Sequence, residues 1–361
     1  AQAVPASNDD DDLMAAAAAE QVWQSLYDRK NFQTDVLQKA EFWRATTGNA
    51  FIKSYWNGGA KQIEPQKITD PYTGQTQTIQ AEVSAGDVDY EVVSPFHLFV
   101  PDLSEENIES QPYIFNVYTK SEQWVKSTFG KVLPKNFSPT KVASSEIFDA
   151  ALMDQRNTSQ VKPDSVLVIE MWAKPDGCPY LPKGGLVTIV DNEIVQFAEN
   201  GIPYAHKQYP FAHTIATGKF YRRGVIKNII PLQREYNRVR SQIIQAKNLM
   251  SKPQMMYQEG SVDPRKVTAR PGVWIPIRPG FTMPTPVPIQ PLPAYVLNEV
   301  KQLESDFEDL SGQHAVSRGE SGGVTAATAI NYLQERDDAY LTSVFNSIEA
   351  AIEKIAKQSL S

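Results

Sequence analysis

The chain has 361 residues, which is enough for two or three domains, and its formal net charge of -7 excludes a uniformly basic nucleic-acid-coating protein. No apolar run of about 18 residues occurs, so no transmembrane helix is expected, and no signal peptide is visible. The single cysteine, Cys178, excludes an internal disulfide framework and a cysteine-only metal cage.

The N-terminal part of the chain predicts a helix followed by a sheet. The acidic run at residues 9–12 suits a first helical turn, because carboxylates stabilise the positive end of the helix dipole. We expect this helix to cover residues 13–46, with an interruption near Asn31. Residues 48–100 alternate imperfectly between apolar and polar side chains, which predicts antiparallel strands with a hairpin loop at residues 70–74.

The middle of the chain predicts a second group of strands. Residues 121–129 indicate a short helix that Ser121 opens. The β-rich stretches 166–172 and 186–197 predict a three-stranded antiparallel meander with a tight turn at Asp191-Asn192. We expect residues 201–218 to form a loop.

Two apolar seams predict two long amphipathic helices. The first helix covers residues 225–250, and the second begins near Ala294 and ends at Ser311-Gly312. Both seams have the alternating spacing of three and four residues that places side chains on one helical face. The seam residues are Ile229, Leu232, Tyr236, Val239, Ile243, Ala246 and Met250 in the first helix, and Val296, Val300, Leu303, Phe307 and Leu310 in the second.

A proline-rich segment separates these two helices. Residues 251–293 contain ten prolines, which exclude a helix across this segment. We expect short strands at residues 255–257 and 273–277, and an extended conformation close to polyproline II at residues 284–293.

Basic side chains are concentrated in one part of this otherwise acidic chain. Between residues 219 and 252 the only acid is Glu235. One interpretation is non-specific phosphate binding through counterion release. The other is pairing with acids of a neighbouring subunit, which we favour because the net charge of -7 supplies them. The basic residues are Lys219, Arg222, Arg223, Lys227, Arg234, Arg238, Arg240, Lys247 and Lys252.

A polar loop and a last helix complete the chain. The loop covers residues 313–323, and the helix begins near Val324 with an apolar seam that Asp337 interrupts. The chain starts without Met and stops inside this helical pattern, so we expect it to be part of a longer protein.

No motif in the sequence supports catalysis. Residues 319–323 match the G-x-S-x-G elbow of α/β-hydrolases, but that motif requires a preceding strand and a later His, and no His follows. His206 and His213 lack the further ligands that a metal site needs, so we interpret them as packed loop residues. We predict no enzyme, no metal and no cofactor.

Several stretches together resemble phage portal proteins, and most closely those of short-tailed phages. Each stretch is short, but their order along the chain makes the combination specific. Gly86-Asp87-Val88 through Ser94-Pro95-Phe96 is similar to the portal wing strand motif. Pro231-Leu232-Gln233-Arg234-Glu235-Tyr236-Asn237, with Ser241 and Met250-Ser251-Lys252-Pro253, resembles the helix that enters the stem. Ser311-Gly312, Gly319, Ser321-Gly322 and Thr325-Ala326-Ala327, with Ile330 and Leu333, resemble the tunnel loop and the helix after it.

The resemblance implies an α+β portal fold with an α/β wing, a two-helix stem, a small proline-rich α/β clip and a long channel helix after a tunnel loop. The expected boundaries are residues 1–224 for the wing, 225–250 and 294–312 for the outbound and returning stem helices, 251–293 for the clip, 313–323 for the tunnel loop and 324–361 for the channel-side wing helix.

The resemblance also implies a function and partners. The chain would form a homo-oligomeric ring, usually of twelve subunits, at one capsid vertex of the virion after assembly in the host cytoplasm. The ring would let double-stranded DNA pass without recognising its sequence. Its protein partners would be the major capsid protein, the terminase large subunit and the head–tail adaptor, and no membrane is expected among its partners. The alternative is a DNA-binding or scaffolding protein without a channel that uses the basic helix at residues 219–252.

The resemblance further assigns roles to three groups of residues. Gln313, His314, Ser317, Arg318, Gly319, Glu320 and Ser321 would face DNA in the tunnel loop. Ile229, Leu232, Tyr236, Val239, Ile243, Val300, Leu303 and Phe307 would pack the stem and its neighbours, and Tyr257, Arg265, Trp274 and Arg278 would contact partners at the clip.

Overall fold

The computed structural model describes most of the chain in two compact units. The first unit comprises residues 1–226 and 338–361, and the second comprises residues 227–337. The described residues are 3–69, 76–84, 86–130, 165–214, 218–268, 271–288, 293–311, 342 and 345–361.

The first unit opens with a helical segment in three parts. Helix α1 (Asp10–Arg29) is followed by the π-helix η1 (Phe32–Leu37) and by α2 (Gln38–Thr47). Asn31 separates the first two parts and adopts the left-handed conformation with φ 47°, which Asn tolerates better than most residues. The predicted helix and its interruption are confirmed, although α1 begins within the acidic run rather than after it.

A three-stranded antiparallel sheet follows, with the order β10-β1-β4. It consists of β1 (Phe51–Asn57), β4 (Asp87–Val93) and β10 (Phe211–His213). The prediction of a continuous loop at residues 201–218 was wrong at β10. This strand is fully buried and too short to show an alternating pattern, so only its pairing with β1 reveals it.

Two further strands, β2 (Lys61–Thr69) and β3 (Thr76–Ser84), pair with each other in antiparallel register. They flank the predicted hairpin loop at residues 70–74, which itself lies outside the described residues.

The second sheet of this unit has five antiparallel strands in the order β5-β6-β7-β8-β9. The predicted meander is confirmed as β7 to β9, with left-handed Asp191 and Asn192 at the turn between β8 and β9. The predicted short helix is α3 (Glu122–Phe129), and the Ser121 hydroxyl caps it by accepting from the Trp124 amide at 3.2 Å. The five strands are β5 (Leu98–Phe99), β6 (Tyr113–Ser121), β7 (Ser165–Ala173), β8 (Gly185–Val190) and β9 (Glu193–Ala198).

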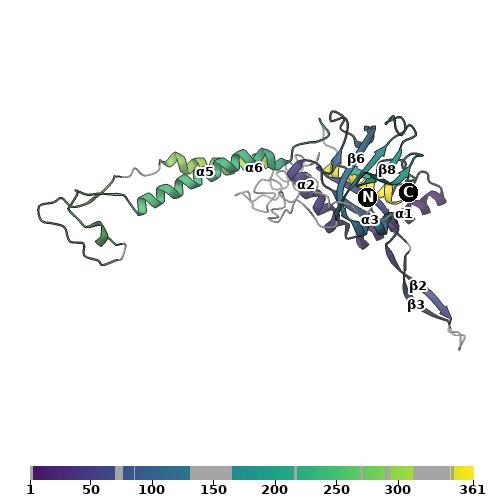
Figure 1. Ribbon diagram of the computed structural model, residues 1–361, viewed down its shortest axis with the longest axis horizontal. Coiled ribbons are helices and arrows are strands. Elements are labelled where there is room, and N and C mark those ends of the chain that lie inside the picture. The colour runs from purple at the N-terminus through teal and green to yellow at the C-terminus, as the bar shows by residue number, and fades with distance from the viewer. Residues whose placement is uncertain are drawn as a thin grey trace. The chain divides into compact units, whose positions relative to one another are not determined.

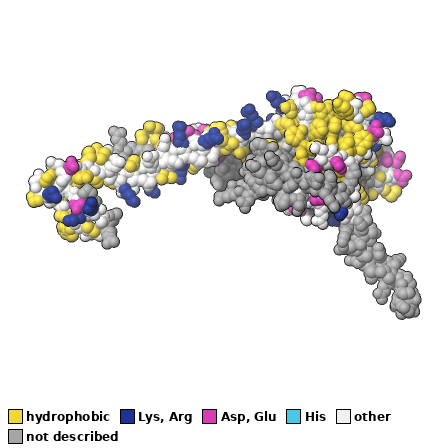
Figure 2. Space-filling view, in the orientation of Figure 1, with side chains coloured by type: hydrophobic (Ala, Val, Ile, Leu, Met, Phe, Trp, Pro, Cys, Tyr) yellow, Lys and Arg dark blue, Asp and Glu magenta, His cyan; other side chains and the backbone are white. Residues whose placement is uncertain are grey.

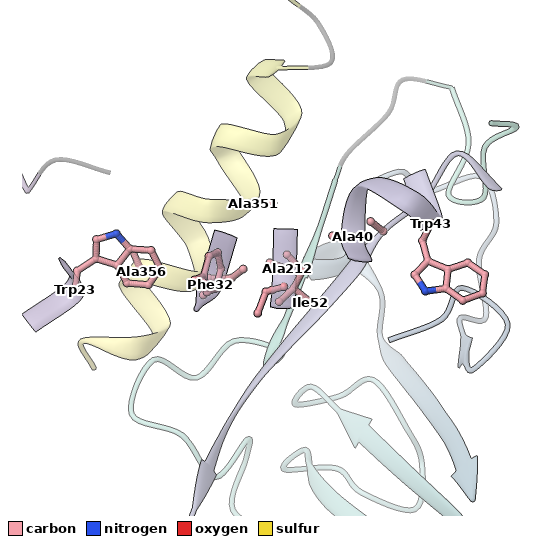
Figure 3. Packing of buried hydrophobic residues seen from close by; sticks show 11 residues of the cluster. Trp23, Phe32, Ala40, Trp43, Ile52, Ala212, Ala351 and Ala356 are labelled. Carbon is pink, nitrogen blue, oxygen red and sulfur yellow. The ribbon is translucent and has the colours of Figure 1, made fainter. Parts of the chain in front are cut away.

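The core of the first unit joins the two ends of the chain. The C-terminal helix, described over residues 345–359, inserts Ala351, Ile355 and Ala356 into a cluster with Trp23 and Phe32 (Figure 3). The same cluster includes side chains of α2, β1 and β10, so this helix covers the small sheet together with the N-terminal helices. A second cluster contains buried side chains of both the three-stranded and the five-stranded sheets.

The second unit contains two helices and the segment between them. Helix α5 (Val225–Ser251) and helix α6 (Ala294–Ser311) are the two predicted amphipathic helices (Figure 1). Between them lie β11 (Met255–Met256), the 3₁₀ turn η3 (Pro264–Lys266) and β12 (Thr285–Pro286).

Two expectations for the segment between the helices were wrong. Residues 273–277 form no strand. Instead β12, which lies in the stretch expected to be polyproline II, pairs with β11. This pairing tolerates Pro286 because the Val287 amide beside it donates to the Gln254 carbonyl at 2.7 Å.

Candidate functional site

The second unit is held together by a narrow contact between α5 and α6, which lie side by side in Figure 1. The rings of Tyr236 and Phe307 meet edge to face with centroids 6.2 Å apart, and the Tyr236 hydroxyl donates to Glu304 Oε1 at 3.4 Å. Val239 and Leu303 are the buried hydrophobic residues in the described part of this unit, exposed by 6% and 5%. The helices therefore meet along the predicted seams.

The other predicted stem residues are only partly covered. Ile229, Leu232 and Ile243 on α5 and Val300 on α6 are half-buried. The contact with the other helix of the same chain therefore leaves part of each side chain exposed to water. Their role in packing between subunits stays a prediction.

A second apolar face of α5 was missed by sequence reasoning. Ile226, Ile230 and Ile244 are exposed by 40–55% and lie off the seam that meets α6. The spacing of four residues between Ile226 and Ile230 is a signal that could have found this face.

The segment at residues 251–293, here called the clip, surrounds an open apolar cavity. The cavity has a volume of about 520 Å³. Ser261 is the one buried residue among the described clip residues, and its carbonyl accepts from the Arg278 amide at 3.1 Å. The clip thus presents an apolar lining without a closed core. The lining residues are Met255, Tyr257, Val262, Val267, Ile275, Ile277, Met283 and Pro284.

The predicted clip contact residues are all exposed. Tyr257 lines the cavity, whereas the Trp274 side chain is 95% exposed. Arg265 lies in η3, and Arg278 also has an exposed side chain. The structure brings Tyr257 to the cavity but does not gather the four residues into one site.

The predicted tunnel loop cannot be placed, because Gln313 to Ser321 and the rest of residues 312–341 lie outside the described residues. The described end of the helix after it is firmly attached to the first unit. Lys354 Nζ lies 2.5 Å from Glu109 Oε1 and donates to the Phe211 carbonyl at 2.8 Å. Burial lowers the pKa of Lys354, although Glu109 opposes this effect. Gln358 adds hydrogen bonds to Ser54 and to the Tyr209 carbonyl.

A buried ion pair joins the three-stranded and the five-stranded sheets of the first unit. Lys53 on β1 contacts Glu170 on β7 at 2.6 Å, and both side chains are at most 10% exposed. Tyr118 and Asn116 on β6 donate to the same carboxylate at 2.6 and 3.2 Å. Burial alone would raise the pKa of Glu170, but the ammonium of Lys53 and these donors hold it below its ordinary value.

The two histidines considered as metal ligands are packed against aromatic rings. His213 stacks on Phe51 with ring centroids 4.5 Å apart, and burial lowers its pKa to about 3. His206 stacks on Tyr204 at 5.3 Å. His206 thus packs on a ring within a loop, whereas His213 packs within strand β10 and not in the expected loop. Within the described ranges, no group of three or more His, Cys, Asp or Glu side chains is arranged to hold a metal ion.

Comparison with known proteins gives a family match over part of the chain. Residues 187–361, just under half of the chain, match the family model described as phage P22-like portal protein. The match supports a phage portal protein. It begins within β8 and includes α5, the clip, α6 and the C-terminal helix. No curated protein matches the chain.

The match bears directly on catalysis and on the fold class. The phage portal family is structural, so the chain is not an enzyme, as predicted from its motifs. The α+β class is also confirmed by the observed helices and sheets. Among the helices that the structure describes, none combines the length and the apolar character needed to cross a membrane.

Proposed function

We propose that the chain is the subunit of a phage portal, closest to those of short-tailed phages. Twelve copies would form a ring at one capsid vertex, and the virion's double-stranded DNA would enter and leave through it. The family match carries this proposal. The resemblance adds that assembly takes place in the host cytoplasm before the ring becomes part of the virion.

The exposed apolar surface of the second unit supports assembly into a ring. Figure 2 shows hydrophobic side chains at the clip among charged and polar ones. So many exposed large apolar side chains on one segment indicate an interaction site. Neighbouring subunits and partner proteins would cover it. The exposed large apolar residues of the clip are Met255, Met256, Tyr257, Val267, Val273, Trp274, Ile275, Ile277, Phe281 and Met283.

Under this proposal the parts of the chain take the roles of a portal subunit. Residues 1–224 form the wing, residues 225–250 and 294–312 the stem, and residues 324–361 the channel-side helix. The clip would dock the terminase large subunit during packaging and the head–tail adaptor afterwards, with Tyr257, Trp274 and the two arginines Arg265 and Arg278 at the contact. The wing would contact the major capsid protein.

The tunnel loop at residues 313–323 would face DNA. Duplex DNA carries one charge per about 1.7 Å of its axis, so strong phosphate binding would oppose sliding. The loop offers mixed charges, Arg318 and Glu320, among polar residues and glycines. Such a loop suits weak contacts with DNA that stay the same as the duplex slides and rotates past it.

Replacement of Gly319, Gly322 and Gly323 by alanine tests the role of this loop. We expect rings to form normally, while phage particles assembled with the variant contain less DNA, because alanine restricts the conformations of the loop. DNA per particle is the measurement. Gly58→Ala with Gly59→Ala is the matched control, since a methyl group meets no atom closer than 3.5 Å at either position. Normal DNA content in the loop variant would contradict a DNA-handling role for the loop.

A further inference from the structure

The charges of the second unit are sorted by helix. Helix α5 carries five basic side chains and one acid, whereas α6 carries five acids and one lysine. Figure 2 shows Lys and Arg side chains along this pair of helices. The two helices together are close to neutral, so the sorting is hidden in the net charge. The charged residues are Lys227, Arg234, Glu235, Arg238, Arg240 and Lys247 on α5, and Glu299, Lys301, Glu304, Asp306, Glu308 and Asp309 on α6.

This complementarity is not used between the two helices of one chain. The described residues form no ion pair between α5 and α6, and the contact consists of the aromatic pair, the Tyr236 hydrogen bond and the apolar seam. The ion pair described on α5 joins neighbours on the same helix, Arg238 and Glu235, at 3.0 Å. Arg234 and Arg240 on α5, and Glu299 and Asp309 on α6, are exposed.

The basic helix also has an apolar stripe that faces away from α6. Ile230 and Ile244 on this stripe are exposed by 40% and 55%, and the spacings along the helix place Arg234 and Arg240 on its two sides. On α6, Leu297 is exposed by 54% among the acids. An apolar stripe flanked by charges is the pattern of a helix that packs against a partner helix of opposite charge.

We propose that α6 of one subunit packs on the outer face of α5 of the next, with the isoleucine stripe covered and the acids of α6 opposite the bases of α5. This inference rests on the proposed ring and assigns the surface through which adjacent subunits contact each other. Two different, complementary surfaces on one chain allow a head-to-tail contact, and such contacts generate rings when the rotation between copies closes. A two-fold contact centred on α5 would bring like charges together.

DNA is a less suitable occupant of the same surface. A duplex that approaches the basic side chains of α5 also meets the acids of α6 beside them, so attraction and repulsion largely cancel. In the proposed ring, in contrast, one neighbour places acids against α5 and the other neighbour places bases against α6.

A charge-swap experiment on the full-length chain tests this assignment. The first variant is Arg234→Glu with Arg240→Glu, and the second is Glu299→Lys with Asp309→Lys. Each should remain folded, because all four side chains are exposed, and should fail to form rings when it is alone. Mixed in equal amounts, the two variants should form rings of alternating subunits, since every interface then pairs an acidic helix with a basic one. Electron microscopy and mass measurement of each sample are the readouts.

The controls separate this proposal from the ring proposal and from DNA binding. Lys126→Glu with Lys183→Glu changes the same charge at exposed positions of the first unit and should leave rings intact. Rings from both single-sided variants would overturn the interface assigned here while leaving the ring itself standing. If the α5 variant forms rings but loses affinity for a 30-base-pair duplex, the basic helix binds DNA. A wild-type chain that forms no rings would contradict the proposed function instead.

Discussion

At the scale of single residues, the pair of Lys53 and Glu170 bears most on the architecture of the first unit. The two residues stand 117 positions apart and join the three-stranded sheet to the five-stranded sheet. Four aromatic rings lie within 6 Å of the Lys53 ammonium, among them Tyr118 and Trp172. Nothing in the local sequence indicates that either residue is buried. In a strand that alternates between apolar and polar residues, charged side chains usually face water. Only the pairing of the strands reveals this contact.

Replacement of Glu170 by glutamine should strongly destabilise the first unit. The change leaves the Lys53 charge buried without its partner, which costs about 3–5 kcal/mol of the free energy of unfolding. Urea denaturation followed by tryptophan fluorescence measures this value. The control is Glu41→Gln, which removes a partly exposed pair with Arg44 and should cost below about 1 kcal/mol. Equal effects of the two changes would contradict the importance of the buried pair.

At the scale of elements, helices with a long seam could be predicted and short buried strands could not. The apolar spacing placed α5 and α6 within one or two residues of their observed bounds. Strand β10 was missed, and a strand was wrongly expected at residues 273–277, because a few consecutive apolar residues carry no periodic signal. Whether such a segment forms a strand depends on pairing with another strand. Residues Phe211 to His213 pair with β1, whereas residues 273–277 pair with no strand.

The C-terminal helix shows the same limit for contacts between distant parts of the chain. Its own seam predicts that Ile348, Ile352 and Ile355 face a core, and the structure buries or partly buries all three. The sequence does not indicate that this core is formed by the N-terminal helices, with Trp23 and Phe32 among the partners.

Truncation of Ile355 to alanine should therefore weaken the attachment of this helix. Ile355 is fully buried in the cluster with the N-terminal helices, so the change should lower the free energy of unfolding by about 2–5 kcal/mol. Leu360→Ala, at an exposed position beyond the helix, is the control and should change it by no more than about 0.5 kcal/mol. Thermal unfolding of the two variants side by side provides the comparison, and equal transition temperatures would contradict the packing described for Ile355.

At the scale of the whole molecule, the two units differ in how they bury apolar surface. The first unit has closed cores that join both ends of the chain. The second leaves its clip and one face of α5 exposed, and a monomer gains little stability from such a surface. The order of helix, proline-rich segment and helix was visible in the sequence, and it carried the resemblance to portal proteins. The unmet apolar and charged surfaces appear only once α5 and α6 are placed together.

We infer that further copies of the chain cover the exposed apolar and charged surfaces of the second unit in a closed ring. Electron microscopy of the purified chain at near-physiological salt tests this claim most directly. We predict closed rings with a central hole, most of them with twelve subunits. Monomers or dimers that bind DNA tightly and release it as salt increases would contradict the account and favour a DNA-binding protein without a channel.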